Sequence, residues 1–68
     1  MRINFSENLK SLRLQHNLMQ KDLADKMGTT QRRVSYLESG KIEPDLRALL
    51  VLSDIFEISI DDLIKEKF

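Results

Sequence analysis

Two short amphipathic segments, residues 20–27 and 31–39, stand in tandem near the middle of the chain, and they constrain its fold more than any other feature. In each segment, apolar residues recur at the three- and four-residue spacing of one helix face. These residues are Leu23, Ala24 and Met27 in the first segment and Val34 and Leu37 in the second. Between the segments, Gly28 can adopt the positive φ that ends a helix, and Thr30 can cap the next one. The sequence therefore predicts two helices joined by a tight turn.

Three further apolar segments predict three more helices around this pair. The first covers about residues 6–15, and the last opens at Ser59, a possible cap, and runs to the chain end. The remaining helix begins after Asp45, which is a good N-cap. We expect its inward stripe to consist of Leu46, Leu49, Leu50, Ser53 and Phe56. No segment alternates as a strand does, so we expect an all-α bundle of five helices in a single domain, residues 1–68.

The composition excludes several kinds of site. With no Cys and a single His, neither a disulfide nor a zinc site is expected, and we expect no cofactor. His16 stands at a predicted helix end, where capping is its expected role, and the acidic residues Asp61, Asp62 and Glu66 form no evident catalytic set. We therefore expect no enzyme. The longest apolar run, residues 48–52, is too short to span a bilayer, so a soluble, cytoplasmic protein without a small-molecule ligand is expected.

Charge is unevenly distributed along the chain, although the formal net charge is zero. Residues 1–41 contain eight Lys and Arg against four Asp and Glu, a balance of +4, and residues 42–68 contain three against seven, a balance of −4. This polarity fits a domain with a basic face for phosphates and an acidic end turned away from them. Ordinary surface scatter would give the same counts, and charge alone does not decide between the two.

The outward face of residues 31–39 carries side chains that are suited to reading DNA. On a helical wheel with Val34 and Leu37 inward, the opposite arc is centred on Arg32, with Ser35 and Tyr36 beside it and Gln31 at its margin. An α-helix fits the major groove, where Arg pairs with guanine and Gln with adenine. A merely solvated helix face is the alternative, which the two-helix frame makes less favourable. Tyr36 can contact sugar, a thymine methyl or phosphate, or cover the edge of the core, and the sequence leaves this open.

A longer pattern extends through and beyond the two central helices: Leu18-x-Gln20-x-x-Leu23-Ala24-x-x-x-Gly28-x-Thr30-x-x-x-Val34-x-x-Leu37-Glu38-x-Gly40. It continues through Pro44, Leu49, Leu52, Phe56, Ile58, Ser59, Asp61, Leu63 and Ile64. With this pattern the chain resembles the Cro and phage-repressor type of helix-turn-helix protein, also called the XRE family. The resemblance implies a lambda-repressor-like fold and a sequence-specific, usually dimeric regulator of transcription that binds double-stranded DNA.

Carried over position by position, the resemblance also assigns candidate site residues. The base-reading positions are Gln31, Arg32 and Tyr36, with Arg33 and Ser35 nearby. The phosphate-binding positions are Gln20, Lys41, Arg47 and Thr30. Gln20 has a physical reason as well, because its amide and the free N–H groups of the helix start can face a phosphate together. Arg13 and Glu38 are placed side by side as a structural ion pair.

Two residues depart from the pattern of the family. Met19 stands where Ser or Thr usually caps a helix, so this helix start must rely on Asp22. Glu57 stands where Gly or Asn usually follows the fourth helix, at a position expected to need a positive φ. Both departures put local stability in doubt and leave the fold unaffected.

Aliphatic residues left over after the core is assigned predict an association surface: Val51, Ile55, Ile58, Ile60, Ile64 and Phe68. From these residues we expect a homodimer built on the last two helices, which acts as a repressor on a palindromic operator. Scattered exposed aliphatics on a small protein are the alternative. For the whole chain, the main competing hypothesis is a protein-interaction adaptor or antitoxin-like module of the same fold without operator specificity.

Overall fold

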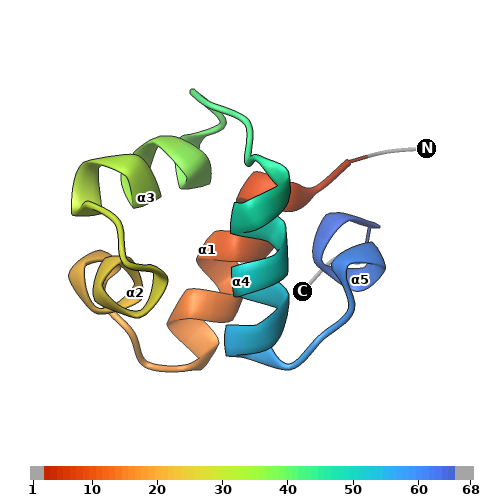
Figure 1. The fold of residues 1–68 in the computed structure, drawn as a ribbon, viewed down its shortest axis with the longest axis horizontal. Coiled ribbons are helices and arrows are strands. Elements are labelled where there is room, and N and C mark those ends of the chain that lie inside the picture. The colour runs from red at the N-terminus through yellow and green to blue at the C-terminus, as the bar shows by residue number, and fades with distance from the viewer. Residues whose placement is uncertain (1–2, 66–68) are drawn as a thin grey trace.

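The computed structural model describes residues 3–65, and this range contains five α-helices (Figure 1). They are α1 (Phe5–Gln15), α2 (Gln20–Met27), α3 (Gln31–Ser39), α4 (Leu46–Phe56) and α5 (Ile60–Lys65). The prediction of an all-α, five-helix fold is confirmed, and the expected extension of the last helix past residue 65 lies outside the described residues. The predicted helix-turn-helix corresponds to α2 and α3.

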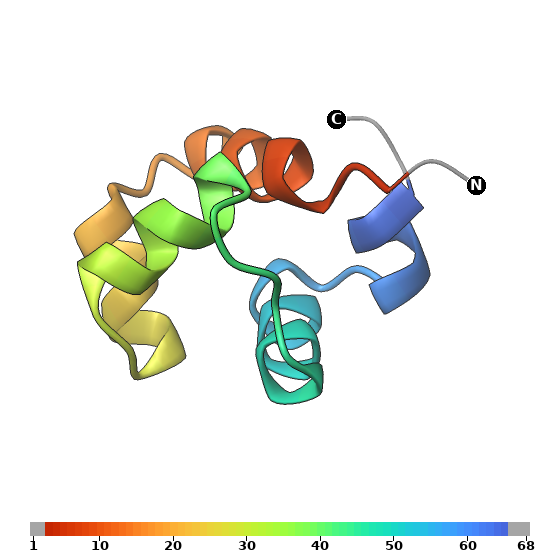
Figure 2. The same cartoon turned by 90° about the horizontal axis from the view of Figure 1, so that it is seen from above.

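The five helices are arranged with the helix-turn-helix at one end of the molecule and α5 at the other (Figures 1 and 2). α1 and α4 lie between these ends. α1 contacts both α3 and α5, and α4 contacts both α2 and α5. Because α1 and α4 each touch both ends, they hold the two-helix unit of α2 and α3 on a fixed support.

A single apolar cluster forms the core between the helices. Its buried members are Phe5, Leu9, Leu12, Leu23, Ala24, Val34, Leu37, Leu52, Phe56 and Leu63. Each helix contributes at least one residue, so the cluster connects all five. Burying aliphatic side chains of this size stabilises a fold by about 1.5–3 kcal/mol for each residue. The inward residues expected for the two central helices are therefore found in the core, with Met27 packed at its edge.

The inward face of α4 differs from the prediction. Ala48, Leu52 and Phe56 form the buried stripe, at a spacing of four residues, whereas Leu46 and Leu50 are 70% and 55% exposed. Phe56 and Leu49 face the core as expected, but the inward placement of Leu46 and Leu50 was wrong. Residues 48–52 are all apolar, so periodicity alone fits more than one rotation of the helix. The rotation is decided by the surfaces of α2 and α5 against which α4 packs.

The helix starts are satisfied by the side chains that the sequence indicated. Asp45 accepts a hydrogen bond from the backbone N–H of Ala48 at 2.8 Å, and Ser59 accepts one from that of Asp62 at 2.9 Å. At the start of α2, the backbone N–H of Met19 donates to the Asp22 carboxylate at 2.8 Å. Asp22 thus compensates for the missing Ser or Thr, as predicted.

Two helices end with a left-handed residue that is not glycine. Glu57 has φ 54° at the end of α4, which is the positive φ expected there, and Asn17 has φ 57° after α1. Gly28 and Gly40 occupy the same region at the ends of α2 and α3. Asn tolerates this conformation better than Glu does, so Glu57 is the strained position.

Two asparagines attach α5 to the start of α1. The Asn8 side chain donates to the Leu63 carbonyl at 2.8 Å, and the Asn4 side chain donates to the Lys65 carbonyl at 3.1 Å. The Asn4 backbone N–H donates to the Ile64 carbonyl at 2.7 Å. Three consecutive carbonyls at the end of a six-residue helix are therefore satisfied by α1 and the residue before it. Nothing in the sequence indicates this role, because Asn8 resembles an ordinary polar residue within a helix.

Candidate nucleic-acid interface

α3 presents opposite faces to the core and to solvent. Val34 and Leu37 are fully buried, while Gln31 and Arg32 are exposed and Tyr36 is half-buried. Thr30 starts the helix by accepting a hydrogen bond from the Arg33 backbone N–H at 3.2 Å. The buried pair fixes the rotation of α3, which lies at one end of the molecule (Figure 2), so Gln31 and Arg32 face solvent there.

Tyr36 contacts two cationic side chains on this surface. Arg32 Nε donates to the Tyr36 hydroxyl at 2.8 Å, and the centre of the Arg32 guanidinium lies 5.4 Å from the ring centroid. Lys41 Nζ lies 4.6 Å from the same centroid. Cations within about 6 Å of an aromatic ring are attracted by its negative face. The structure therefore brings together a predicted base-reading residue and a predicted phosphate-binding residue around one ring.

Arg33 is directed toward a different partner. Its Nη2 lies 3.4 Å from Asp45 Oδ2, at the start of α4. Both side chains are substantially exposed, 38% for Arg33 and 65% for Asp45, so this contact is weak and competes with solvent. In the structure, Arg33 thus connects α3 to α4, whereas Arg32 and Tyr36 contact each other.

Gln20, Arg13 and Glu38 form a hydrogen-bonded network behind this surface. Arg13 Nε donates to Glu38 Oε2 at 2.6 Å, and Arg13 Nη2 donates to Glu38 Oε1 at 3.1 Å. Gln20 Nε2 donates to the same Oε1 at 3.2 Å. The two charged side chains are only 10% and 4% exposed, so the ion pair is buried and bidentate. It joins α1 to α3, and the bond to Gln20 adds the start of α2.

The remaining predicted phosphate ligands are all exposed. Lys41 follows Gly40 at the end of α3, Arg47 lies in the first turn of α4, and Thr30 uses its hydroxyl to cap α3. Lys10 was not predicted, yet it lines a small polar hollow together with Gln20, Ser35 and Glu38. No local signal marks Lys10, because its position beside α3 results from the packing of α1.

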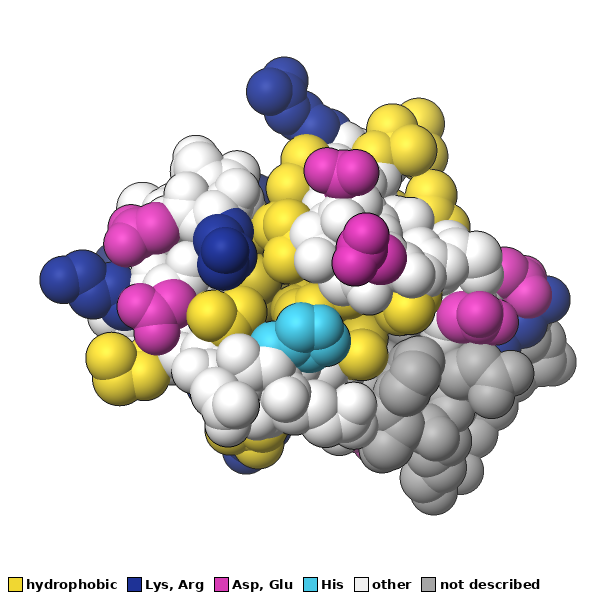
Figure 3. Space-filling model, turned by 90° about the horizontal axis from the view of Figure 1, so that it is seen from below, with side chains coloured by type: hydrophobic (Ala, Val, Ile, Leu, Met, Phe, Trp, Pro, Cys, Tyr) yellow, Lys and Arg dark blue, Asp and Glu magenta, His cyan; other side chains and the backbone are white. Residues whose placement is uncertain are grey.

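His16 lies away from this surface, on the face shown in Figure 3. Its Nδ1 is 2.8 Å from the Leu12 carbonyl, and its ring meets that of Phe56 edge-on with centroids 4.9 Å apart. In Figure 3, the histidine covers apolar side chains at the centre of the face. His16 therefore takes part in ending α1 and in packing against Phe56.

Within residues 3–65, the structure also bears on metal binding and on membrane crossing. In this range, no group of three or more His, Cys, Asp and Glu side chains is placed to hold a metal ion. Within the same residues, every helix is too short or too polar to cross a membrane.

Comparisons with known proteins also indicate a helix-turn-helix protein. The helix-turn-helix family model matches residues 9–63. YqaE of Bacillus subtilis, an uncharacterized HTH-type transcriptional regulator, is 44% identical over 61 residues, which cover 90% of this chain and 53% of YqaE. The chain therefore spans about half the length of this relative.

Two solved structures extend the similarity to three dimensions. A transcriptional regulator from Listeria innocua superposes with a TM-score of 0.89 and is 34% identical, covering 94% of this chain and 60% of that one. The P22 c2 repressor, in complex with a synthetic operator, superposes with a TM-score of 0.84 and is 28% identical, covering 90% of this chain and 92% of the repressor. From the family match, the identity to YqaE and the shared fold, we conclude that the chain belongs to the helix-turn-helix family, in its XRE type.

Proposed function

We propose that this protein is a sequence-specific, double-stranded DNA-binding regulator of transcription and has no enzymatic activity. The observation that carries the proposal is the exposed face of α3, where Gln31 and Arg32 lie in the first turn and Tyr36 lies one turn later. A recognition helix contacts base edges with its N-terminal residues. Arg and Gln are the side chains that pair with guanine and adenine in the major groove. Such a role also places the protein in the cytoplasm, with the DNA.

Phosphate contacts on either side of α3 would set its position in the groove. Lys41 stands at one end of α3, and Gln20 stands at the start of α2, where free backbone N–H groups favour an anion. Arg47, Thr30 and the newly noted Lys10 are further candidates. The P22 c2 repressor, which shares the fold and was solved with a synthetic operator, supports this docking by analogy.

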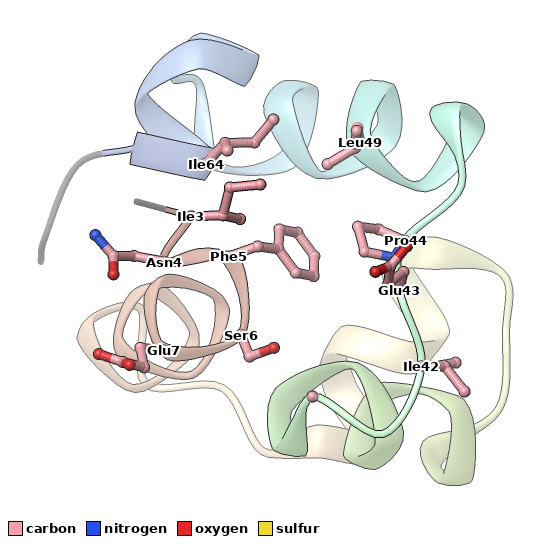
Figure 4. Close-up of a pocket in the computed structure, with 11 residues that line it drawn as sticks. Ile3, Asn4, Phe5, Ser6, Glu7, Ile42, Glu43, Pro44, Leu49 and Ile64 are labelled. Atoms are coloured by element: carbon pink, nitrogen blue, oxygen red, sulfur yellow. The ribbon is translucent and has the colours of Figure 1, made fainter. Parts of the chain in front are cut away.

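We further propose that two copies associate through the outer face of α4. Leu46 and Leu50 lie one turn apart on this face and are the most exposed leucines of the helix. Beside this face, Leu49 packs against the core and also lines a groove of about 470 Å³ together with Ile3, Phe5, Pro44 and Ile64 (Figure 4). In Figure 4 these side chains converge on a common space. An exposed apolar surface of this kind supports association with a second copy, and a contact between identical surfaces would be two-fold.

This surface differs in part from the one expected from the sequence. Ile55 and Ile58 are half-buried and pack against the core, which removes them from the centre of the proposed interface. Val51, Ile60 and Ile64 are also half-buried but do not pack against the core cluster, so they remain candidates, while Phe68 lies outside the described residues. A two-fold dimer would place two copies of α3 about 34–36 Å apart, one DNA turn, on a palindromic operator. Occupying such a site blocks transcription, which is the repressor mode that we propose.

Selection from a random DNA library, followed by titration at several salt concentrations, tests the function. A DNA reader should enrich one motif and lose affinity steeply as salt rises, because each phosphate contact releases counterions. A module that only binds other proteins, the competing function, should enrich no motif. That result would overturn the proposal.

Two substitutions separate base reading from phosphate binding. We expect Arg32→Ala to relax the preference at one base pair by about 1–3 kcal/mol. We expect Lys41→Ala to weaken all sequences alike and to reduce the salt slope by roughly 1. Equal losses from both variants on every sequence would contradict this division.

A further inference from the structure

The contact between Arg32 and Tyr36 leaves one edge of the Arg32 guanidinium occupied and the other free. Arg carries five N–H donors, one on Nε and four on the two Nη atoms. In the structure the Nε donor is taken by the Tyr36 hydroxyl at 2.8 Å. The donors on Nη1 and Nη2 stay available at the exposed end of the side chain.

The Tyr36 ring is itself fixed in place. The Lys41 ammonium lies 4.6 Å from the ring centroid, and the backbone N–H of Lys41 donates to the Tyr36 carbonyl at 3.0 Å. Tyr36 is therefore half-buried and bonded at both its backbone and its ring, which makes it a rigid support for a longer and more exposed side chain.

We propose that Tyr36 is a specificity-determining positioning residue, which holds Arg32 so that its two Nη atoms meet the O6 and N7 acceptors of a guanine end-on. A free Arg side chain loses many rotamers on binding, and this loss lowers its affinity for every base. A side chain that is already held in its bound orientation loses fewer rotamers. This inference rests on the proposed function, and in it Tyr36 acts through Arg32 instead of contacting a base.

Tyr36→Phe isolates this role, because it removes the hydroxyl and keeps the ring beside Lys41. Binding is measured to two duplexes. One carries the motif that the wild-type protein selects, and in the other the G·C pair at which Arg32→Ala loses its preference is replaced by A·T. We expect Tyr36→Phe to reduce the preference between these duplexes by about two- to tenfold, the range of one hydrogen bond. The salt slope should not change, since Lys41 keeps its aromatic support.

A double-mutant cycle shows whether Tyr36 acts through Arg32. In the Arg32→Ala background, Tyr36→Phe should change the base preference by less than about twofold. Ser39→Ala also removes a single hydroxyl, but that hydroxyl bonds the Tyr36 backbone carbonyl and does not touch Arg32. The carbonyl keeps its bond from the Lys41 backbone N–H, so Ser39→Ala is the matched control and should keep the wild-type preference. In the free protein, the NMR signal of the Arg32 Nε–H should shift and exchange faster with water in Tyr36→Phe but not in Ser39→Ala.

The possible outcomes separate this inference from the proposed function. A wild-type protein that selects no motif overturns the proposed function, and the inference with it. A selected motif whose guanine preference survives Tyr36→Phe in full overturns the inference alone. The inference is also overturned if Tyr36→Phe weakens binding to both duplexes equally. It is overturned as well if Tyr36→Phe lowers the base preference as strongly in the Arg32→Ala background as in the wild-type protein. Thermal unfolding of each variant verifies that all comparisons are made on folded protein.

Discussion

Arg13 and Glu38 form a bidentate ion pair in which neither side chain is more than 10% exposed, and the pair joins the end of α1 to the end of α3. The Arg13 Nη1 atom also donates to the Leu18 carbonyl at 2.8 Å, and Gln20 bonds the Glu38 carboxylate. The pair therefore lies at the centre of the contacts that orient α2 and α3 on the rest of the molecule. It stabilises the recognition surface without being part of it.

We predict that Glu38→Gln destabilises the protein by about 3–5 kcal/mol, because it leaves the Arg13 cation buried without its counter-ion. Urea unfolding measures this change. Arg33→Ala is the matched control, since it breaks the exposed pair with Asp45 and should cost at most about 1 kcal/mol. Similar losses for the two variants would show that burial of the Arg13–Glu38 pair has no special effect.

We predict that Asn8→Ala loosens α5 selectively. The substitution leaves the buried Leu63 carbonyl without a donor, which costs about 1–3 kcal/mol. Hydrogen exchange should show faster exchange of amides in α5, while those in α2 and α3 stay protected. Gln15→Ala, at an exposed position of the same helix, should leave exchange in α5 unchanged. Uniform loss of protection in all helices would contradict a local role for Asn8.

We predict that Glu57→Gly stabilises the protein by about 0.5–1 kcal/mol. At φ 54° the Cβ of Glu57 lies too close to a backbone carbonyl oxygen, and a negative charge also stands at the unfavourable end of α4. Thermal unfolding should show a rise of roughly 2–8 °C for a chain of this size. Asn17→Gly is the comparison, because Asn already tolerates φ 57°, and its gain should be smaller. An equal gain at both positions would argue against strain specific to Glu57.

We predict that Leu46→Glu prevents association of two copies and leaves the fold intact. Leu46 is 70% exposed and starts α4, where a negative charge is favourable, so the folded monomer should tolerate the change. Sedimentation equilibrium should show a concentration-dependent dimer for the wild-type protein and a monomer for the variant. Leu14→Glu, on α1 and 56% exposed, is the control and should remain dimeric. If the wild-type protein is monomeric at every concentration, with and without operator DNA, the proposed dimer is wrong.

The features that the sequence predicts correctly are those that depend only on residues a few positions apart. Thr30, Asp45 and Ser59 cap helices as their positions indicated, and Asp22 compensates for Met19. Such bonds span three residues, so the sequence carries the whole cause. The inward placement of Val34 and Leu37 followed in the same way, because α3 has only one apolar stripe.

The missed parts involve partners that are distant in sequence. The bond from Asn8 to Leu63 spans 55 residues, and nothing near Asn8 indicates it. The predicted placement of Leu46 and Leu50 was wrong because the apolar residues of α4 are continuous in sequence. Only the packing of α4 against α2 and α5 decides that these two leucines face solvent. The bond between Gln20 and Glu38 likewise depends on how α2 meets α3.

By itself, the sequence determined the five helical segments, their caps and the polar face of α3, because backbone hydrogen bonds and side-chain periodicity act over a few residues. Only the tertiary structure decided which leucines of α4 face solvent, how α5 is attached, and that Tyr36 contacts both Arg32 and Lys41. These features depend on the angles at which helices pack. Packing angles are set jointly by surfaces that are far apart in the chain, so no local pattern contains them.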